Sequence, residues 1–505
     1  MHIQMMTRAR FSLPGRWLRL RLAIAAGLAA LADILFFGQA IGFSLALFLG
    51  AVGAACVFTN PIRVTPGVRK IAWVLFGLAL LPLVEDFSWL SGMIGLTGTA
   101  CFVLIMARGF HADVMSYAKI LPNLLVVGAF QLTDDVTRVH ALKKRLKVPV
   151  LGFAHLVTWV LPLVLFVVFL MLFASANPLI DGWLSAIDLR ALADLLQPSR
   201  IFIWTLVIVI VWPLIHVQRA QKRRATLAVL QPQNPMMADP NGFFGVAAIS
   251  RSLVLFNALF AMQSVMDIAY LWGGVQLPND MSYAAYAHRG AYPLVVTSLL
   301  AAGFVLMAMR RGGPAESSKL IKPLVLIWTA QNVLLVTSSV IRLDLYVAVY
   351  SLTYLRVAAF IWMGLVVNGL VLIIAKIMLA KSNDWLIRFN LGALGLVLYA
   401  CCFINFPHVM AQYNVERGRI LRQYNLVNRT NKTFTRLDFA YLQALGPQVI
   451  PALDSFIQQQ PDAPNTTEAT HIRRKLLEDH INTAHGWRAW TFRAWRLDQY
   501  LAMKS

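Results

Sequence analysis

The sequence is poor in charged side chains, and acidic ones are especially scarce. Asp, Glu, Lys and Arg make up 13% of the 505 residues, whereas soluble domains contain about 25%. Lys and Arg number 45 against 23 Asp and Glu, which gives a formal net charge of +22. No zinc-finger, helix-turn-helix or RNP pattern accompanies this charge, so we expect it to set membrane topology and expect no nucleic-acid partner.

The sequence also lacks the patterns that many hydrolases, phosphate-binding proteins, metal sites and disulfide frameworks require. It contains no GxSxG, GxxxxGK[ST], HExxH or CxxC, and its histidines are scattered without the spacing of metal ligands. All four cysteines lie in apolar segments, where we expect them to pack as small apolar side chains. We therefore expect no metal and no cofactor, and the sequence leans against an enzyme.

Apolar residues make up 58% of the chain and gather in long runs between residues 20 and 405. The hydrocarbon core of a bilayer is about 30 Å thick, so a helical crossing needs about 20 residues. The pattern predicts an all-α, polytopic transmembrane helix bundle of about 11 spans. The predicted spans are 22–38, 41–58, 71–85, 89–107, 149–173, 200–217, 249–272, 291–309, 320–341, 355–379 and 386–405.

Basic residues gather in alternate loops, which predicts the orientation of the spans. Clusters such as Arg223-Arg224 and Arg310-Arg311 fall in every second loop, and the intervening loops are acidic or nearly neutral. Lys and Arg favour cytoplasmic loops. The N-terminus is therefore expected in the cytoplasm, and the C-terminus outside, which in a bacterium is the periplasm. The predicted domains are a transmembrane bundle at 1–406 and an extracytoplasmic (periplasmic) helical tail at 407–505.

The tail has the pattern of a small helical module. Apolar residues recur at helical spacing over 437–445, from 449 to 457 and from 468 to about 482, which predicts three helices. Trp487, Trp490 and Trp495, interleaved with arginines, follow near the end. An amphipathic helix that docks on the module or lies at lipid headgroups is the simplest interpretation of this end. Stacking on an aromatic or anionic ligand is the alternative.

Ionisable residues inside the membrane are candidate functional groups, because a charge there must be paired or hydrated. Asp267 lies near the outer end of the span at 249–272, and Gln263 shares its helix face. His288, Arg289 and Arg342 are its possible partners. Polar and aromatic residues at several outer ends then predict a polar outer-mouth site, although an aromatic belt with structural ion pairs also fits. The candidate residues are Asp267, Tyr283, Tyr286, His288, Arg289, Tyr292, Arg342, Asp344, Tyr354 and Arg356.

Three separate segments resemble a known family. They are YAAYAHRGAYPL at 283–294, LTYLRVAAFIW at 352–362 and LDFAYLQALGPQVIPAL at 437–453. Together they are similar to a bacterial integral-membrane family, domain of unknown function 4173. The resemblance implies a bacterial inner (plasma) membrane location and an outward tail after the last span, and it carries no assigned reaction.

Three functions are compatible with these features. The first is a non-enzymatic scaffold, sensor partner or regulator that acts at the periplasmic face. The second is a transporter or lipid-handling protein with an outward-facing polar cavity, in which arginines hold phosphate or carboxylate groups. The third is an integral-membrane transferase with Asp267 as general base. The expected partners are membrane lipids and either another envelope protein or an anionic ligand.

Overall fold

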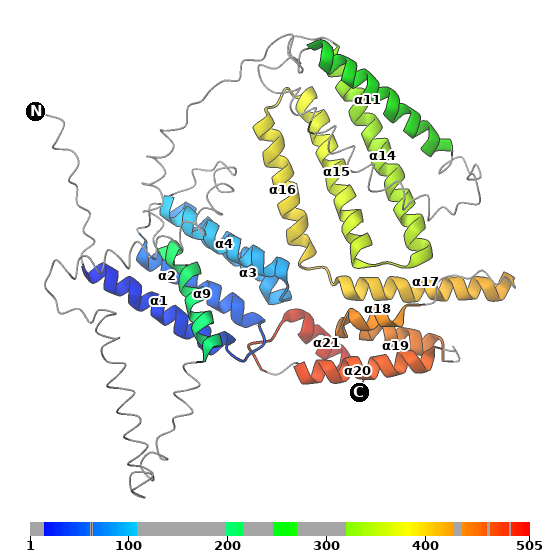
Figure 1. Ribbon diagram of the computed structural model, residues 1–505. Helices are drawn as coiled ribbons and strands as arrows, with labels where there is room; N and C mark the ends of the chain where they lie inside the picture. The colour runs from blue at the N-terminus through cyan, green and yellow to red at the C-terminus, as the bar shows by residue number, and fades with distance from the viewer. Residues whose placement is uncertain are drawn as a thin grey trace, which may run out of the picture. The chain divides into compact units, whose positions relative to one another are not determined.

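The computed structural model describes residues 15–60, 62, 64–108, 197–215, 246–269, 303, 320–428, 437–461, 465–483 and 486–504. These residues are built from helices, joined by turns and short extended links (Figure 1). Their contacts group them in two compact units. The first contains α1 to α4, α9 and residues 486–491, and the second contains α11 and α14 to α21.

The first unit is a bundle of apolar helices. Its members are α1 (Gly15–Phe36), α2 (Phe43–Thr59), α3 (Pro66–Glu85), α4 (Trp89–Arg108) and α9 (Pro198–Ile215). Small residues let α3 and α4 approach closely, since a Cβ added at Gly98 would lie 2.3 Å from that of Ala79. Close packing over small residues is what holds helices together in lipid, where apolar burial gives little driving force.

Polar side chains connect the helices of this unit at both of its ends. Asn60 donates to the carbonyl oxygen of Leu214 at 2.9 Å, which joins the ends of α2 and α9. At the other end, Asp33 accepts a hydrogen bond from Trp204 at 3.2 Å and lies 3.4 Å from Arg200. Asp33 interrupts the first predicted span, and these two contacts supply the partners that its carboxylate needs.

A segment from the end of the chain belongs to this first unit. The backbone N–H groups of Phe43 and Ser44 donate to the carbonyl oxygens of Trp490 and Arg488, at 2.9 and 3.2 Å. The first N–H groups of a helix have no partner within the helix, so residues 486–491 satisfy two of them at the start of α2. A Cβ at Gly42 would lie 2.5 Å from the carbonyl oxygen of Ala489. Only glycine leaves room for this approach.

The second unit begins with two parallel helices, α11 (Val246–Asp267) and α14 (Ile321–Tyr350). Asn257 donates to the carbonyl oxygen of Leu324 at 3.1 Å, and Asp267 contacts Arg342 farther along both helices. The later residue of α11 contacts the later residue of α14, so the two helices run in the same direction. Between them Phe260 packs edge-on against Trp328, with ring centroids 6.3 Å apart.

The second unit continues with two antiparallel helices and a group of tail helices. These are α15 (Tyr354–Met378), α16 (Asn383–Cys401), α17 (Phe406–Asn428), α18 (Phe439–Ala444), the 3-10 turn η3 (Pro447–Val449), α19 (Ile450–Gln459), α20 (Thr466–Thr483) and α21 (Phe492–Ala502). Figure 1 shows α17 lying across the ends of α14 and α15. Met410, Leu442, Leu453, Leu476 and Leu497 belong to one buried cluster, so α17 to α21 share a core.

A buried carboxylate fixes three of the tail helices together. Asp454 of α19 accepts from Arg473 of α20 at 2.6 Å and from Tyr500 of α21 at 3.0 Å, and Lys504 lies 3.7 Å away. Burial raises the pKa of the Tyr500 hydroxyl, and the carboxylate of Asp454 raises it further. The phenol therefore stays protonated and donates at neutral pH.

The structure supports a multi-pass membrane protein. Among the described residues, six helices are long and apolar enough to cross a membrane, namely α3, α4, α11, α14, α15 and α16, and two further apolar helices are shorter. The predicted spans 149–173 and 291–309 lie outside the described residues. The total of about 11 spans stays a prediction.

One predicted boundary is wrong. The span expected at 320–341 is a 30-residue helix that continues to Tyr350. The predicted span stops one residue before Arg342. In the structure Asp267 contacts that guanidinium, so the charge does not stop the helix. In the tail, α18, α19 and α20 lie where helices were predicted, whereas α17 was not expected.

The contact at Gly42 gives a first test. Gly42→Val should displace residues 486–491 from the start of α2, because the new Cβ would overlap the carbonyl group of Ala489. Trypsin should then cut after Arg488 faster in the purified full-length protein, as measured by mass spectrometry of the released C-terminal peptide. Gly50→Val is the control, since a Cβ there meets nothing within 4 Å. Equal cleavage in the two variants would contradict the docking.

Candidate functional site

The most deeply buried charges described in the second unit are those of Asp267 and Arg342. Arg342 Nη2 contacts Asp267 Oδ1 between the parallel helices, and the two side chains are only 4% and 1% exposed. Gln263, one turn earlier on α11, donates to the same carboxylate oxygen at 2.9 Å. Arg342 is one of the three partners that the sequence suggested for Asp267, and it makes the contact. The other two, His288 and Arg289, lie outside the described residues.

This arrangement favours a structural role for the pair. In a buried ion pair the two charges compensate each other, and removal of one partner leaves an unpaired buried charge. A general base must instead reach a substrate proton, directly or through one water. The Asp267 side chain is almost fully covered and faces a guanidinium. The pair is therefore suited to holding α11 and α14 together.

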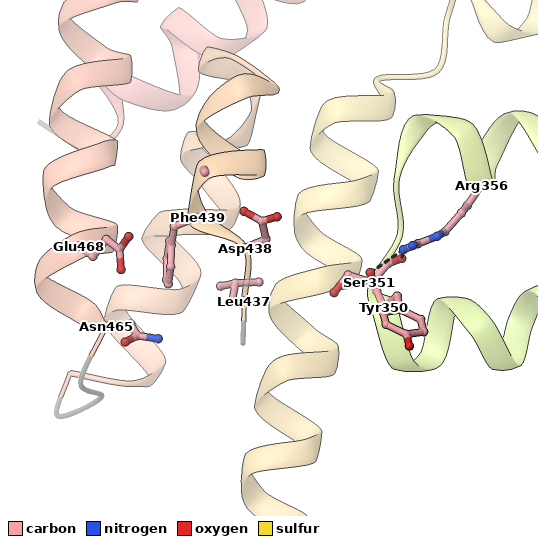
Figure 2. A pocket seen from close by; sticks show the side chains of 9 residues that line it. Tyr350, Ser351, Arg356, Leu437, Asp438, Phe439, Asn465 and Glu468 are labelled. Atoms are coloured by element: carbon pink, nitrogen blue, oxygen red, sulfur yellow. Dashed lines mark hydrogen bonds between the residues drawn. The ribbon is translucent and has the colours of Figure 1, made fainter. Parts of the chain in front are cut away.

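Arg356 has a different role, at the turn between α14 and α15. Its guanidinium donates to the carbonyl oxygens of Tyr350 and Ser351 (Figure 2) and lies 4.5 Å from the ring centre of Tyr346. The last carbonyl groups of a helix lack partners within the helix, and a cation near them is favourable. Ser351 has a φ of 70°, a left-handed turn residue that these contacts hold in place.

The tail helices are hydrogen bonded to this same turn. Asn414 of α17 accepts from the N–H of Leu352 at 2.7 Å and donates to the carbonyl oxygen of Leu352 at 3.0 Å. Arg417 donates to the carbonyl oxygen of Ala348 at 3.1 Å, and the N–H of Tyr354 donates to the hydroxyl of Tyr441 at 2.9 Å. The tail is therefore bound to the α14–α15 turn through backbone groups that could otherwise bond only to water.

A cleft of about 660 Å³ lies between this turn and the tail. Figure 2 shows Asp438, Phe439, Asn465 and Glu468 from the tail and Tyr350, Ser351 and Arg356 from the turn. Asp438 also caps α18, since its side chain accepts from the N–H of Tyr441 at 2.9 Å. The cleft offers carboxylates, an amide and aromatic rings, a set suited to a polar or cationic group of a partner.

The structure describes five of the predicted outer-mouth residues. Asp267 and Arg342 are buried together, Arg356 caps the turn, and Asp344 and Tyr354 are exposed. Tyr283, Tyr286, His288, Arg289 and Tyr292 lie outside the described residues. Sequence reasoning missed Asp438 and Glu468, although the helix-start pattern before Phe439 marks Asp438 as a capping residue. In the described part of the chain, no group of three His, Cys, Asp or Glu side chains could hold a metal.

The ion pair gives a second test. Asp267→Asn should destabilise the detergent-solubilised protein by about 3 kcal/mol, because it removes the charge that faces a buried guanidinium. Arg342→Gln should cost a similar amount, and the double variant should cost less than the sum of the two. Unfolding free energies would measure this coupling. Asp344→Asn is the control on α14, and strictly additive losses would refute the pairing.

Comparison with known families places the chain. A family model described as Domain of unknown function (DUF4153) matches residues 23–456. The family number expected from the three short segments, 4173, is therefore wrong, whereas the expectation of a domain of unknown function is confirmed. The matched residues cover most of the chain. No curated protein and no solved structure matches it. The chain belongs to the family Domain of unknown function (DUF4153).

Proposed function

We propose that the protein is a non-enzymatic scaffold, sensor partner or regulator of the bacterial inner membrane that acts through its tail at the periplasmic face. One observation carries this proposal: Asn414 makes two hydrogen bonds with the backbone of Leu352. The tail helices are thereby fixed on the ends of two apolar helices, α14 and α15. A fixed module outside the membrane is a suitable platform for an envelope component.

The charges near the opposite ends of these helices support the orientation. Lys376, Lys381 and Arg388 flank the turn between α15 and α16, and basic flanks favour the cytoplasm. The α14–α15 turn, at the other end of α15, then faces outward together with the tail. The contact of residues 486–491 with the start of α2 agrees with this, since the loop before α2 is predicted to lie outside.

The alternatives have less support. A transferase would need an accessible carboxylate at Asp267, and that side chain is 1% exposed and paired. Transport or lipid handling gains some support from the cleft of about 660 Å³. That cleft, however, is lined by tail residues and by residues at the α14–α15 turn, and Arg356 in the first turn of α15 is the one that lies within a candidate span.

Cysteine labelling tests the orientation. Thr470→Cys, on exposed α20, should react with a membrane-impermeant maleimide in intact spheroplasts. Lys381→Cys, in the exposed turn between α15 and α16, should react only after permeabilisation. The wild-type protein, whose four cysteines lie in or directly beside apolar helices, provides the background. Labelling of Thr470→Cys only after permeabilisation would overturn the outward tail.

Site-specific cross-linking tests the platform. A photoreactive phenylalanine analogue at Glu468, which lines the cleft, should yield an adduct of one defined mass in cells. The same probe at Thr470, exposed on the same helix, should not. Asp438→Asn should weaken the adduct, because it removes a charge from the cleft and leaves an oxygen to cap α18. Equal adducts at both positions, or none at Glu468, would count against the platform.

A further inference from the structure

A second hollow lies beside the contact between α11 and α14, near the first turns of both helices. Its volume is about 720 Å³, and it is lined by Ser250, Arg251, Val254 and Leu255 of α11 and by Leu320, Pro323, Leu324 and Ile327 around the start of α14. Because residues of both helices line it, the hollow is a groove along two adjacent helices.

The walls of this groove are apolar and uncovered by the described residues. Leu255 is 69% exposed and Leu320 is 68% exposed. Both α11 and α14 are candidate membrane spans, so apolar side chains exposed on them face hydrocarbon. From Leu320 to Ile327 the groove extends for about 10 Å along α14, which is most of the depth of one leaflet of a core about 30 Å thick. An acyl chain fits this shape and chemistry.

Two cations lie near the starts of the two helices, and Arg251 is the one that lines the groove. Arg251 is the sixth residue of α11 and lines the groove itself. Lys322 is the second residue of α14 and is exposed. Because the helices run parallel, these residues lie toward the same membrane surface. Arg251 is about 8 Å from the start of its helix, a depth from which its long side chain reaches the headgroups.

We propose that this groove binds one phospholipid with a net negative headgroup. An acyl chain lies against Leu255, Leu324 and Ile327, and the phosphate lies at Arg251. Basic residues beside grooves between spans are suited to anionic headgroups, and the planar guanidinium matches phosphate oxygens. The predicted orientation places the site in the inner leaflet. The inference goes beyond the proposed function, because it concerns the helix ends opposite the tail and holds whatever the tail binds.

Native mass spectrometry of the full-length protein, delipidated and titrated with phosphatidylglycerol or phosphatidylethanolamine of identical chains, tests the site. Phosphatidylglycerol should bind more tightly. Arg251→Gln should weaken its binding about fivefold, which corresponds to about 1 kcal/mol for one cation. Arg251→Lys should restore most of that loss. Lys381→Gln removes an exposed cation from another turn with the same predicted orientation and should change nothing.

A second variant tests the contact with the acyl chain separately from the contact with the headgroup. Leu255→Trp should weaken binding of both lipids, because the indole would occupy the groove. Equal affinity for the two lipids with no effect of Arg251→Gln would overturn the anionic site. No effect of Leu255→Trp would show that the lipid binds elsewhere or that another part of the chain fills the groove. Thr470→Cys labelling in each variant reports whether the tail keeps its orientation, so loss of the lipid site is distinguishable from failure of the proposed function.

Discussion

Polar groups inside a membrane must find their partners within the protein, and the described bundle depends on this constraint. The hydrocarbon core of the membrane offers neither hydrogen bonds nor counter-ions, so each buried donor or acceptor favours one arrangement of neighbouring helices. Asn257 donates to the backbone of Leu324, and Asn60 donates to that of Leu214. Asp267 pairs with Arg342. Apolar surfaces alone would let these helices slide or rotate, and the polar contacts fix which helices pair and in what register.

The same constraint applies at the helix ends, where backbone groups lack partners within the helix. Arg356 satisfies carbonyl groups at the end of α14. Arg493 of α21 donates to the carbonyl oxygens of Cys402 and Ile404, just after α16, at 3.0 and 3.3 Å. In the second unit the tail helices thus complete the hydrogen bonding of apolar helices that end beside them. A tail with this role is part of the membrane domain's structure, which explains why α17 to α21 and α11 to α16 form one compact unit.

The sequence predicted the helices better than it predicted their contacts. Apolar runs of about 20 residues located α3, α4, α15 and α16 to within a few residues, because span length is set by the bilayer. The partner of Asp267 was not determined by spacing, since Arg342 lies 75 residues away and helix packing decides whether the two meet. The contact of Asn414 with Leu352 was not predicted for the same reason. Asn414 lies in α17, whose mixed polar and apolar pattern did not indicate a span.

The two ends of α14 differ in chemistry. One end is bound to the tail, and the other lines the proposed lipid groove. At the C-terminal end of α14 the turn is covered by protein, and Asn414 and Arg417 bind its backbone groups. At the start of α14, apolar side chains are exposed in the groove that Arg251 also lines, and described protein does not cover them. Between these two ends, Arg342 joins α14 to α11 through Asp267, so the same ion pair holds together the two helices that line the groove.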